Sequence, residues 1–181
     1  MNIRNTTEAD VSAIREVHEV AFGPQAGGTI AGLAIALIHD STALPVLSLL
    51  ACDSGVPIGH ILFTRVRVSA SEETTRAHIL APLAVLPSKQ HQGVGTQLVK
   101  RGLAILAESG CELVFVLGHP GYYPRHGFRP AGQLGFSAPY PIPKKNADAW
   151  MVLELCKGKI GSVHGTVRCA DALDKPEHWR E

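Results

Sequence analysis

The fold of this chain is decided around the stretch Pro87-Ser88-Lys89-Gln90-His91-Gln92-Gly93-Val94-Gly95-Thr96. An apolar run precedes it at residues 79–86, and a segment whose apolar residues recur at helical spacing begins at Thr96. A helix that starts directly after a glycine-containing loop can bind a phosphate, because its first turn leaves backbone N–H groups unpaired and carries a partial positive charge. The stretch therefore predicts either a nucleotide-like ligand or a tight strand-to-helix turn without one.

Two common phosphate motifs do not fit this stretch. A P-loop requires GxxxxGK followed by Ser or Thr, which the sequence lacks. The dinucleotide fingerprint GxGxxG requires a glycine where Leu98 stands. A ligand of this loop is therefore expected to belong to another class.

Length and composition indicate an ordinary globular domain. The chain has 181 residues, and we expect a single domain over residues 1–181. Apolar residues make up 45% and charged residues 18% of the chain, which allows a normal core. The formal net charge of +1 gives no electrostatic footprint for nucleic acid or an anionic membrane, so neither is expected as a partner.

The cysteines and histidines point away from disulfides and metal sites. The four cysteines include no CxxC pair and lie in or beside apolar runs, which favours buried free thiols in a reducing compartment. The nine histidines show no HxxxH or HExxH spacing, so no metal site is expected.

Features of membrane insertion or export are not recognised either. The first residues contain no apolar core of the signal-peptide type. The uncharged stretch at residues 27–38 is shorter than the roughly 20 apolar residues that span a bilayer. We therefore expect a soluble, cytoplasmic protein.

Hydrophobic periodicity predicts alternating strands and helices. The predicted strands cover residues 3–4, 46–52, 58–68, 76–86, 113–117, 150–155 and 160–167. The predicted helices are one with an apolar face from Val11 to Ala21, a second that follows a glycine-rich break at residues 23–28 and ends near His39, a third at 96–108 and a short aromatic one at 121–128. A polar loop is predicted at residues 69–75. This order is mixed α/β and favours a single mixed sheet flanked by helices.

Two motifs in this order resemble a known family. The pattern Leu83-Ala84-Val85-x-Pro87-x-x-Gln90-x-x-Gly93-Val94-Gly95 looks like the acetyl-CoA loop of the GNAT acetyltransferase superfamily, whose motif is Gln/Arg-x-x-Gly-x-Gly/Ala. The segment Tyr122-Tyr123-Pro124-Arg125-His126-Gly127-Phe128 resembles the family's Tyr-x-x-x-Gly-Phe segment. One predicted helix and one predicted strand separate the two, as in the family. The Leu-Gly-x-Pro-x-Tyr-Tyr sequence at residues 117–123 is similar to the bacterial YhbS-like branch.

The resemblance implies a fold, a co-substrate and a set of binding residues. The fold is the acyl-CoA N-acyltransferase fold, of α/β (α+β) class, with a single mixed, largely antiparallel sheet flanked by helices. The implied reaction transfers an acetyl group from acetyl-CoA directly to an amine of a small molecule or peptide. The implied acetyl-CoA-binding residues are Leu83, Ala84, Val85, Gln90, His91, Gln92, Gly93, Val94, Gly95 and Thr96.

The resemblance also suggests catalytic residues. Tyr123 matches the family's general acid, which protonates the leaving CoA thiolate, and a phenol with an ordinary pKa of about 10 is protonated at pH 7. The alternative is that Tyr123 only packs. His119 is the best-placed candidate for the general base, because it follows the strand at 113–117 and lies close to Tyr123 in sequence. A structural histidine beside Pro120 is the alternative.

The acceptor is not identified by the sequence. The resemblance implies that it binds near the first two helices and the loops around residues 20–40 and 130–147, and these carry few charges. His60 is expected on the surface of the sheet. A non-catalytic acyl-CoA-binding module, which senses a metabolite or docks to a partner, is the alternative to an enzyme. A homodimer can form if the strand at 160–167 pairs across a two-fold axis, unless residues 171–181 cover it.

Overall fold

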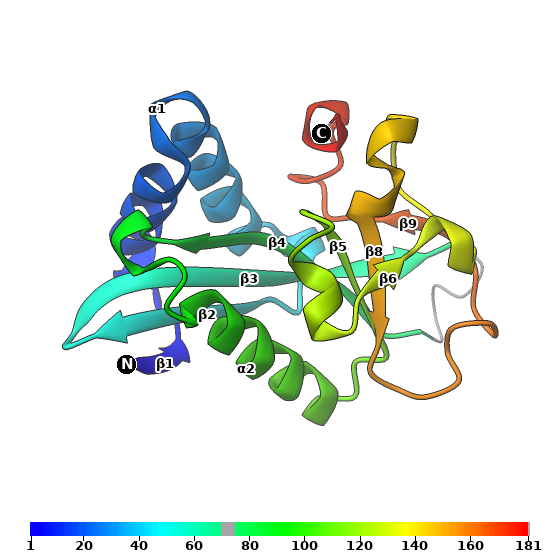
Figure 1. Ribbon diagram of the computed structural model, residues 1–181, viewed down its shortest axis with the longest axis horizontal. Helices are drawn as coiled ribbons and strands as arrows, with labels where there is room; N and C mark the ends of the chain where they lie inside the picture. The colour runs from blue at the N-terminus through cyan, green and yellow to red at the C-terminus, as the bar shows by residue number, and fades with distance from the viewer. Residues whose placement is uncertain (70–74, 181) are drawn as a thin grey trace.

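β3 (Val56–Val68) runs through the centre of the sheet in the computed structural model, which describes residues 1–69 and 75–180. Within these residues the sheet has nine strands, and its main path follows the order β1-β2-β3-β4-β5-β8-β6 (Figure 1). β9 pairs with β3 outside this path, and β7 pairs with β9. Residues 70–74 of the predicted polar loop lie outside the described part of the chain.

The remaining elements agree with the predicted order. The strands are β1 (Asn2–Asn5), β2 (Leu47–Asp53), β4 (Ala77–Val85), β5 (Leu113–Leu117), β6 (Arg129–Pro130), β7 (Phe136–Ser137), β8 (Trp150–Glu154) and β9 (Gly165–Arg168). The helices are α1 (Val11–Ile38) and α2 (Val94–Glu108), and the short 3-10 turns used below are η4 (Tyr123–His126) and η7 (Pro176–Trp179). Each predicted strand overlaps an observed one, and the mixed, largely antiparallel sheet flanked by helices is confirmed. The two-residue strands β6 and β7 were not predicted.

β4 and β5 form a parallel pair that ends before β4 does. Their register runs from Ala77 opposite Leu113 to Leu80 opposite Val116, whereas β4 continues to Val85. A register shift between Ile61 and Phe63 bends the antiparallel β3–β4 ladder at the same level. The last part of β4 therefore has a partner on one side only.

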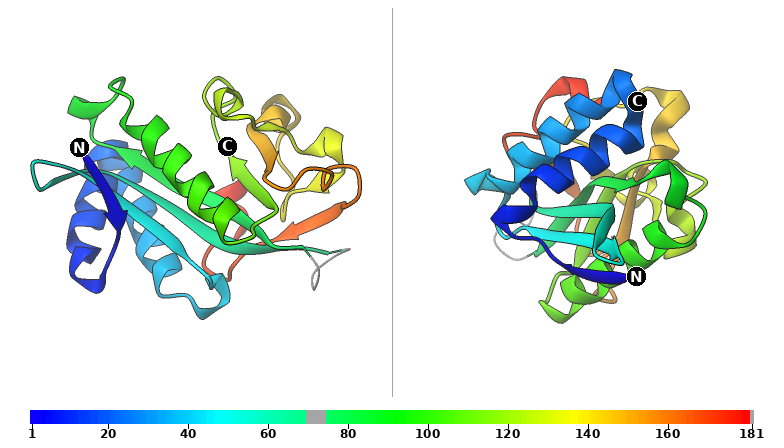
Figure 2. Two further views of the ribbon diagram at one scale, coloured as in Figure 1. Left: turned by 90° about the horizontal axis from the view of Figure 1, so that it is seen from below. Right: turned by 90° about the vertical axis from the view of Figure 1, so that its left-hand side faces the viewer.

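The two long helices cover opposite faces of the sheet (Figure 2). Successive strand residues point to opposite faces, so Val114 and Val116 pack in the core under α2 while Leu113 and Phe115 belong to the core on the α1 side. Figure 2 shows α1 and α2 on either side of the central strands. The sheet is thus buried on both faces up to the point where β4 and β5 separate.

α1 is bent at Gly23, and the predicted break between two helices is wrong in its extent. Gly23 has φ 72° and ψ −174°, outside the helical range. Helical structure resumes at Pro24, because proline is favoured in the first turn of a helix, where its missing N–H has no partner to lose. The other glycines of the stretch, Gly27 and Gly28, are helical.

The expectation about membrane spans also needs correction. No Asp, Glu, Lys or Arg occurs from Val20 to Ile38, so the uncharged run is longer than residues 27–38. By length and composition alone, the helical span Glu8–Ile38 is able to cross a membrane, a test that the core helix of a soluble protein also passes. In the structure, α1 buries residues such as Ile14, Ala31 and Leu37 in the core.

His60 lies in the core and not on the sheet surface, so that expectation is wrong. Its Nδ1 lies 2.8 Å from Nε2 of His18 on α1, and its Nε2 lies 2.9 Å from the Ser48 hydroxyl on β2. Ser48 in turn accepts a 2.7 Å hydrogen bond from the Thr6 hydroxyl. Burial lowers the pKa of His18 to about 4 and that of His60 to about 3, so both are neutral at pH 7. This buried polar chain joins α1 to β2 and β3.

The C-terminal segment is fixed to the core. Asp40 accepts a 2.9 Å hydrogen bond from the Ala172 N–H. The Trp179 indole donates to the Leu173 carbonyl at 3.1 Å and packs edge-on against Trp150, with 5.6 Å between ring centroids.

The predicted strand at 160–167 is shorter, because the N–H groups of Ser162 and Val163 bond locally to the Lys159 carbonyl. The remaining strand, β9, pairs with β3 through Val167 and Arg168 and with β7 through Gly165 and Thr166. Two-fold pairing through the strand expected at 160–167 stays a prediction, with a shorter strand than expected.

The Arg4–Asp10 ion pair joins β1 to the turn before α1. Arg4 donates two hydrogen bonds to the Asp10 carboxylate, at 2.8 and 2.7 Å, and the Thr7 N–H donates a third at 2.8 Å. The hydrogen bonds from Arg4 and then Thr7 hold the pKa of Asp10 well below its ordinary value. Because the folded-state pKa is lowered, this contribution to stability is present above the ordinary Asp pKa and is lost as the pH falls through the folded-state value.

We expect Asp10→Asn to lower the free energy of unfolding at pH 7 by about 1–2 kcal/mol, since it removes a charge-assisted pair and a cap. The difference from the wild type should shrink as the pH falls below about 4, where the unfolded carboxyl is protonated as well. Urea unfolding at several pH values measures this, with the exposed Glu16→Gln as control. A difference that stays constant down to low pH would contradict it.

Candidate active site

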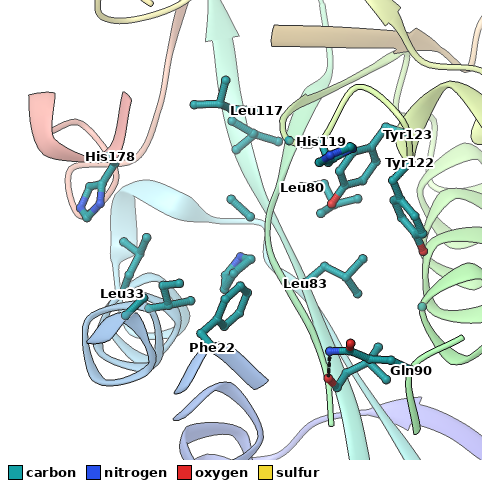
Figure 3. A pocket seen from close by; sticks show the side chains of 18 of the residues that line it. Phe22, Leu33, Leu80, Leu83, Gln90, Leu117, His119, Tyr122, Tyr123 and His178 are labelled. Carbon is teal, nitrogen blue, oxygen red and sulfur yellow. Dashed lines mark hydrogen bonds between the residues drawn. The ribbon is translucent and has the colours of Figure 1, made fainter. Parts of the chain in front are cut away.

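A cavity of about 1040 Å³ opens where β4 and β5 separate. Its walls come from β4, the end of β5, the first turn of α2, the Tyr122–Tyr123 segment, α1 and the C-terminal turn η7 (Figure 3). Segments far apart in the sequence therefore meet around one space.

The first turn of α2 presents unpaired backbone N–H groups to this cavity. Gly93 caps the helix with φ 84°, a left-handed conformation that glycine adopts without a steric penalty. The first hydrogen bond across the helix start runs from the Gln97 N–H to the Gly93 carbonyl at 3.0 Å. The preceding N–H groups, at Val94, Gly95 and Thr96, are thus free for an anion. The helix starts at Val94, slightly before the predicted Thr96.

Side chains of the loop fix its shape. The Gln90 side-chain amide donates to the Val85 carbonyl at 3.0 Å, and that of Gln92 donates to the Ser88 carbonyl at 2.9 Å. Lys89 forms a 2.8 Å ion pair with Asp53. Gln90, His91 and Gly93 to Thr96 line the cavity, whereas Gln92 is not among the lining residues. The loop is therefore shaped before any ligand binds.

The unpaired edge of β4 continues the site away from α2. Leu86 donates its N–H to the Ile58 carbonyl at 3.0 Å, and hydrogen-bonded pairs alternate along an antiparallel ladder. Ala84 therefore turns its backbone groups toward β3, while Leu83 and Val85 turn theirs toward the gap. Leu83 and Val85 line the cavity and Ala84 does not. Two of the three predicted strand residues thus face the site.

Two cationic side chains lie at the α2 end of the cavity. Lys89 and Arg125 line it there, together with the side chain of His91. The Arg125 guanidinium lies 4.8 Å from the centroid of the Tyr122 ring, and it also donates to the Gly121 carbonyl at 3.3 Å. The role of Arg125 was not predicted, because its position in the Tyr-x-x-x-Gly-Phe segment does not reveal which way its side chain points.

Tyr123 lies in the core with its hydroxyl pointing into the cavity toward Leu80 (Figure 3). Its ring packs edge-on against Phe128, with 5.7 Å between centroids, and lies so close to Gly118 that a side chain there would overlap it. Burial, followed by the neighbouring Tyr122, raises the pKa of Tyr123 well above its ordinary value. The phenol is therefore protonated at neutral pH and can donate.

Tyr122 lines the cavity on the side of α2. Its hydroxyl lies against Gly95 in the first turn of α2, where an added Cβ would come within 2.8 Å of it. Burial raises the pKa of Tyr122, against smaller opposing effects of Thr96 and Arg125. Tyr122 thus forms a wall of the cavity next to the helix start.

His119 lines the cavity beside Tyr123 and is exposed. Its Nδ1 accepts a 3.0 Å hydrogen bond from the Gly121 N–H. In a neutral imidazole this places the proton on Nε2, so the ring offers a donor at its free edge. His119 can act as a general base through Nδ1 only if its hydrogen bond with the Gly121 N–H breaks.

The wall opposite Tyr123 contains residues that the sequence analysis did not assign. Leu173, Glu177, His178 and Trp179 of the C-terminal segment line the cavity together with Phe22, Gln25, Thr29 and Leu33 of α1. The region around residues 20–40 contributes as expected, whereas no residue of 130–147 lines it. The sequence contains one indication that the C-terminal segment packs against the rest of the protein, namely the isolated Trp179 among charged residues.

Comparison with known proteins gives a consistent result. Residues 12–128 match the model of the Acetyltransferase (GNAT) family. An Escherichia coli K12 protein named uncharacterized N-acetyltransferase YjhQ is 47% identical over 167 residues, covering 92% of this chain and 90% of that protein. The E. coli protein YhbS, also named an uncharacterized N-acetyltransferase, is 34% identical over 134 residues, covering 72% and 77%.

Two solved structures are similar over nearly the whole chain. The crystal structure of E. coli YhbS in complex with CoA has a TM-score of 0.85 at 28% identity and covers 96% of this chain and 92% of that one. A GNAT family acetyltransferase from Brucella melitensis, in complex with acetyl-CoA, has a TM-score of 0.75 at 31% identity, with coverages of 96% and 97%.

We expect Gly118→Ala to lower the free energy of unfolding by about 1–3 kcal/mol, because the new methyl group overlaps the Tyr123 ring in a packed core. Gly132→Ala is the matched control, since a Cβ at that position meets nothing within 4 Å. Thermal unfolding of both variants measures the effect. Equal stability of the two would contradict the close packing of Tyr123 on Gly118.

Proposed function

This chain belongs to the GNAT acetyltransferase family, with YhbS and YjhQ as relatives, and from that premise we propose that it transfers an acetyl group from acetyl-CoA directly to an amine of its acceptor. One observation carries the proposal. A single cavity connects the free N–H groups of the α2 start with the Tyr123 hydroxyl, along the unpaired edge of β4. The family uses acetyl-CoA as co-substrate, and the two similar structures contain CoA and acetyl-CoA.

The residues of the cavity fit acetyl-CoA. The N–H groups of Val94, Gly95 and Thr96 suit a diphosphate, and the positive side chains at that end suit its charge. The backbone groups of Leu83 and Val85 suit an extended arm with amides, which can bond to a free strand edge. Gln90 acts indirectly in this proposal, because its amide holds the loop against Val85.

Bound acetyl-CoA supplies an acetyl group activated as a thioester. The chain's own contribution is to hold the carbonyl at the β4 edge, where an N–H at Leu83 or Val85 stabilises the negative charge that develops on its oxygen. Tyr123 then donates its proton to the leaving sulfur. An uncharged acceptor amine attacks without an enzyme-bound intermediate.

The cysteines support direct transfer. Cys52 and Cys111 are buried, Cys169 is partly buried and Cys156 is exposed, so the expectation of buried thiols is wrong for Cys156. Burial raises the pKa of Cys111 to about 11, and none of the four lines the cavity. The structure offers no thiolate nucleophile there among its described residues.

We propose further that residues 1–181 form one N-acetyltransferase domain that acts in the bacterial cytoplasm, where free thiols persist. His119 as general base stays a prediction. Its hydrogen bond with the Gly121 N–H favours a ring that donates a proton from Nε2. A homodimer stays a prediction as well.

Tyr123→Phe should lower the rate of CoA thiol release by roughly 100-fold, because the sulfur loses its proton donor, while acetyl-CoA affinity changes little. Thiol release with a library of amines, together with calorimetric binding of acetyl-CoA, measures both. Unchanged turnover would remove Tyr123 from the chemistry. Tight binding by the wild type without thiol release from any amine would favour the non-catalytic sensor.

Gly93→Ala should weaken acetyl-CoA binding by roughly 5–10-fold, because a left-handed conformation strains alanine and disturbs the helix start. Gly55→Ala is the matched control, since Gly55 has a similar φ of 82° in the β2–β3 turn, with open space around it and away from the cavity. Both variants should lose similar stability. An equal loss of acetyl-CoA affinity in both would contradict the role of the loop.

A further inference from the structure

The part of the cavity beyond β4 and β5 has a mostly apolar wall. Figure 3 shows Phe22 and Leu33 of α1 and His178 of the C-terminal turn on the side of the cavity away from Tyr123. The apolar side chains that line this part are Phe22, Ile30, Leu33, Leu173 and Trp179. Gln25 and Thr29 add polar but uncharged groups from α1. This wall suits an acceptor with an apolar body.

Acidic charge in the cavity is limited to one side chain. Among the described lining residues, Glu177 is the only carboxylate, whereas Lys89 and Arg125 lie at the α2 end. A molecule with several ammonium groups would leave all but one of them without an anionic partner in a partly apolar space, which is costly. The charge distribution therefore suits an acceptor with a single ammonium group.

His178 stands next to this carboxylate and is partly buried. Burial lowers the pKa of His178 below the ordinary histidine value; Lys175 lowers it further, while Glu177 and a hydrogen bond to the Ala172 carbonyl raise it. The facing α1 residues Phe22, Gln25 and Thr29 are uncharged, and across the cavity the titratable groups are His119, Tyr122 and Tyr123. His178 is thus neutral at pH 7.

The two cavity histidines differ in the proton that they present. His119 accepts from the Gly121 N–H, which leaves a ring N–H at its free edge. Burial lowers the pKa of His178 and favours its neutral form, and a neutral imidazole has one unprotonated ring nitrogen in either tautomer. His178 therefore has the lone pair that a proton acceptor needs.

The turn that carries Glu177 and His178 is held in place. Trp179 is fully buried against Trp150 and bonds to the Leu173 carbonyl. The Asp40 carboxylate and the Tyr140 hydroxyl tie the same segment down through Ala172 and Asp174, at 2.9 and 3.3 Å. The segment is a fixed wall of the cavity, joined to the end of α1.

Resting on the proposed acetyl transfer, we propose that the acceptor is a monoamine with an apolar body, received by Glu177 and deprotonated by His178. The ammonium group pairs with the Glu177 carboxylate and gives one proton to the free ring nitrogen of His178. The neutral amine forms the N–C bond to the acetyl carbonyl carbon as the C–S bond breaks. The sulfur takes the Tyr123 proton, the new amide nitrogen releases its second proton to restore Tyr123 through solvent, and His178 returns its proton to solvent.

The substrate class is tested by thiol release from acetyl-CoA with two probes, 2-phenylethylamine and spermidine. We expect 2-phenylethylamine to be acetylated with a kcat/KM at least tenfold above that of spermidine. An equal or reversed preference would overturn the assigned class. If acetyl-CoA binds in calorimetry but neither probe nor any amine of a broader library releases thiol, the proposed transfer itself fails, and this inference fails with it.

The two residues are tested by separate readouts with 2-phenylethylamine. Glu177→Gln should raise KM about tenfold with kcat largely kept, because it removes the partner of the ammonium group. His178→Gln should lower kcat about 100-fold and abolish the fall of kcat/KM at low pH, which in the wild type lies below the ordinary histidine range. If the KM of Glu177→Gln or the kcat of His178→Gln stays within twofold of the wild-type value, the role proposed for that residue is overturned.

Controls separate a local effect from a folding defect. Glu108→Gln and His164→Gln make the same chemical changes at exposed positions outside the cavity, and both should keep wild-type kinetics. All four variants should bind acetyl-CoA with wild-type affinity and unfold at a similar temperature. Loss of acetyl-CoA binding in His178→Gln would indicate a structural role and contradict the assignment.

Discussion

Parallel pairing between β4 and β5 stops at Leu80 and Val116, although β4 continues to Val85. Backbone N–H and C=O groups inside a protein need hydrogen-bond partners. Among the described residues at this edge of β4, the fold supplies such a partner only for the Val85 carbonyl, through the side-chain amide of Gln90. The separation of the strands therefore creates the cavity and lines it with unsatisfied backbone groups. The start of α2, Tyr123 and the C-terminal turn are all arranged around this gap.

A second constraint sets the far wall of the same cavity. His18 and His60 form a buried neutral pair, which holds α1 against β3. The His18 ring is parallel to that of Phe22, with 6.1 Å between centroids, and Phe22 lines the cavity. A polar contact in the core thus determines where an apolar wall of the site stands.

The sequence predicts the donor side of the site far better than the acceptor side. In the proposed site, backbone N–H groups bind the donor, and the loop that presents them needs Gly93 and a tie such as Gln90 at fixed spacing, which a motif records. The proposed acceptor side is formed by side chains of α1 and η7, which only the tertiary fold brings together. Likewise, His60 on an alternating strand looked exposed, because its partner His18 is distant in sequence. The bend at Gly23 looked like a break, because Pro24 is tolerated in a first helical turn.

Burial has opposite effects on the pKa of the proposed acid and on that of the proposed base, and this gives both groups the protonation state that they need. Removal from water disfavours the charged form of any group, so it raises the pKa of a phenol and lowers that of an imidazole. Tyr123 is therefore held protonated and His178 unprotonated by the same cause. Opposite shifts of this kind let one group donate and the other accept at a single pH. The fold thus prepares both proposed groups through the same physical effect, although each is buried by its own neighbours.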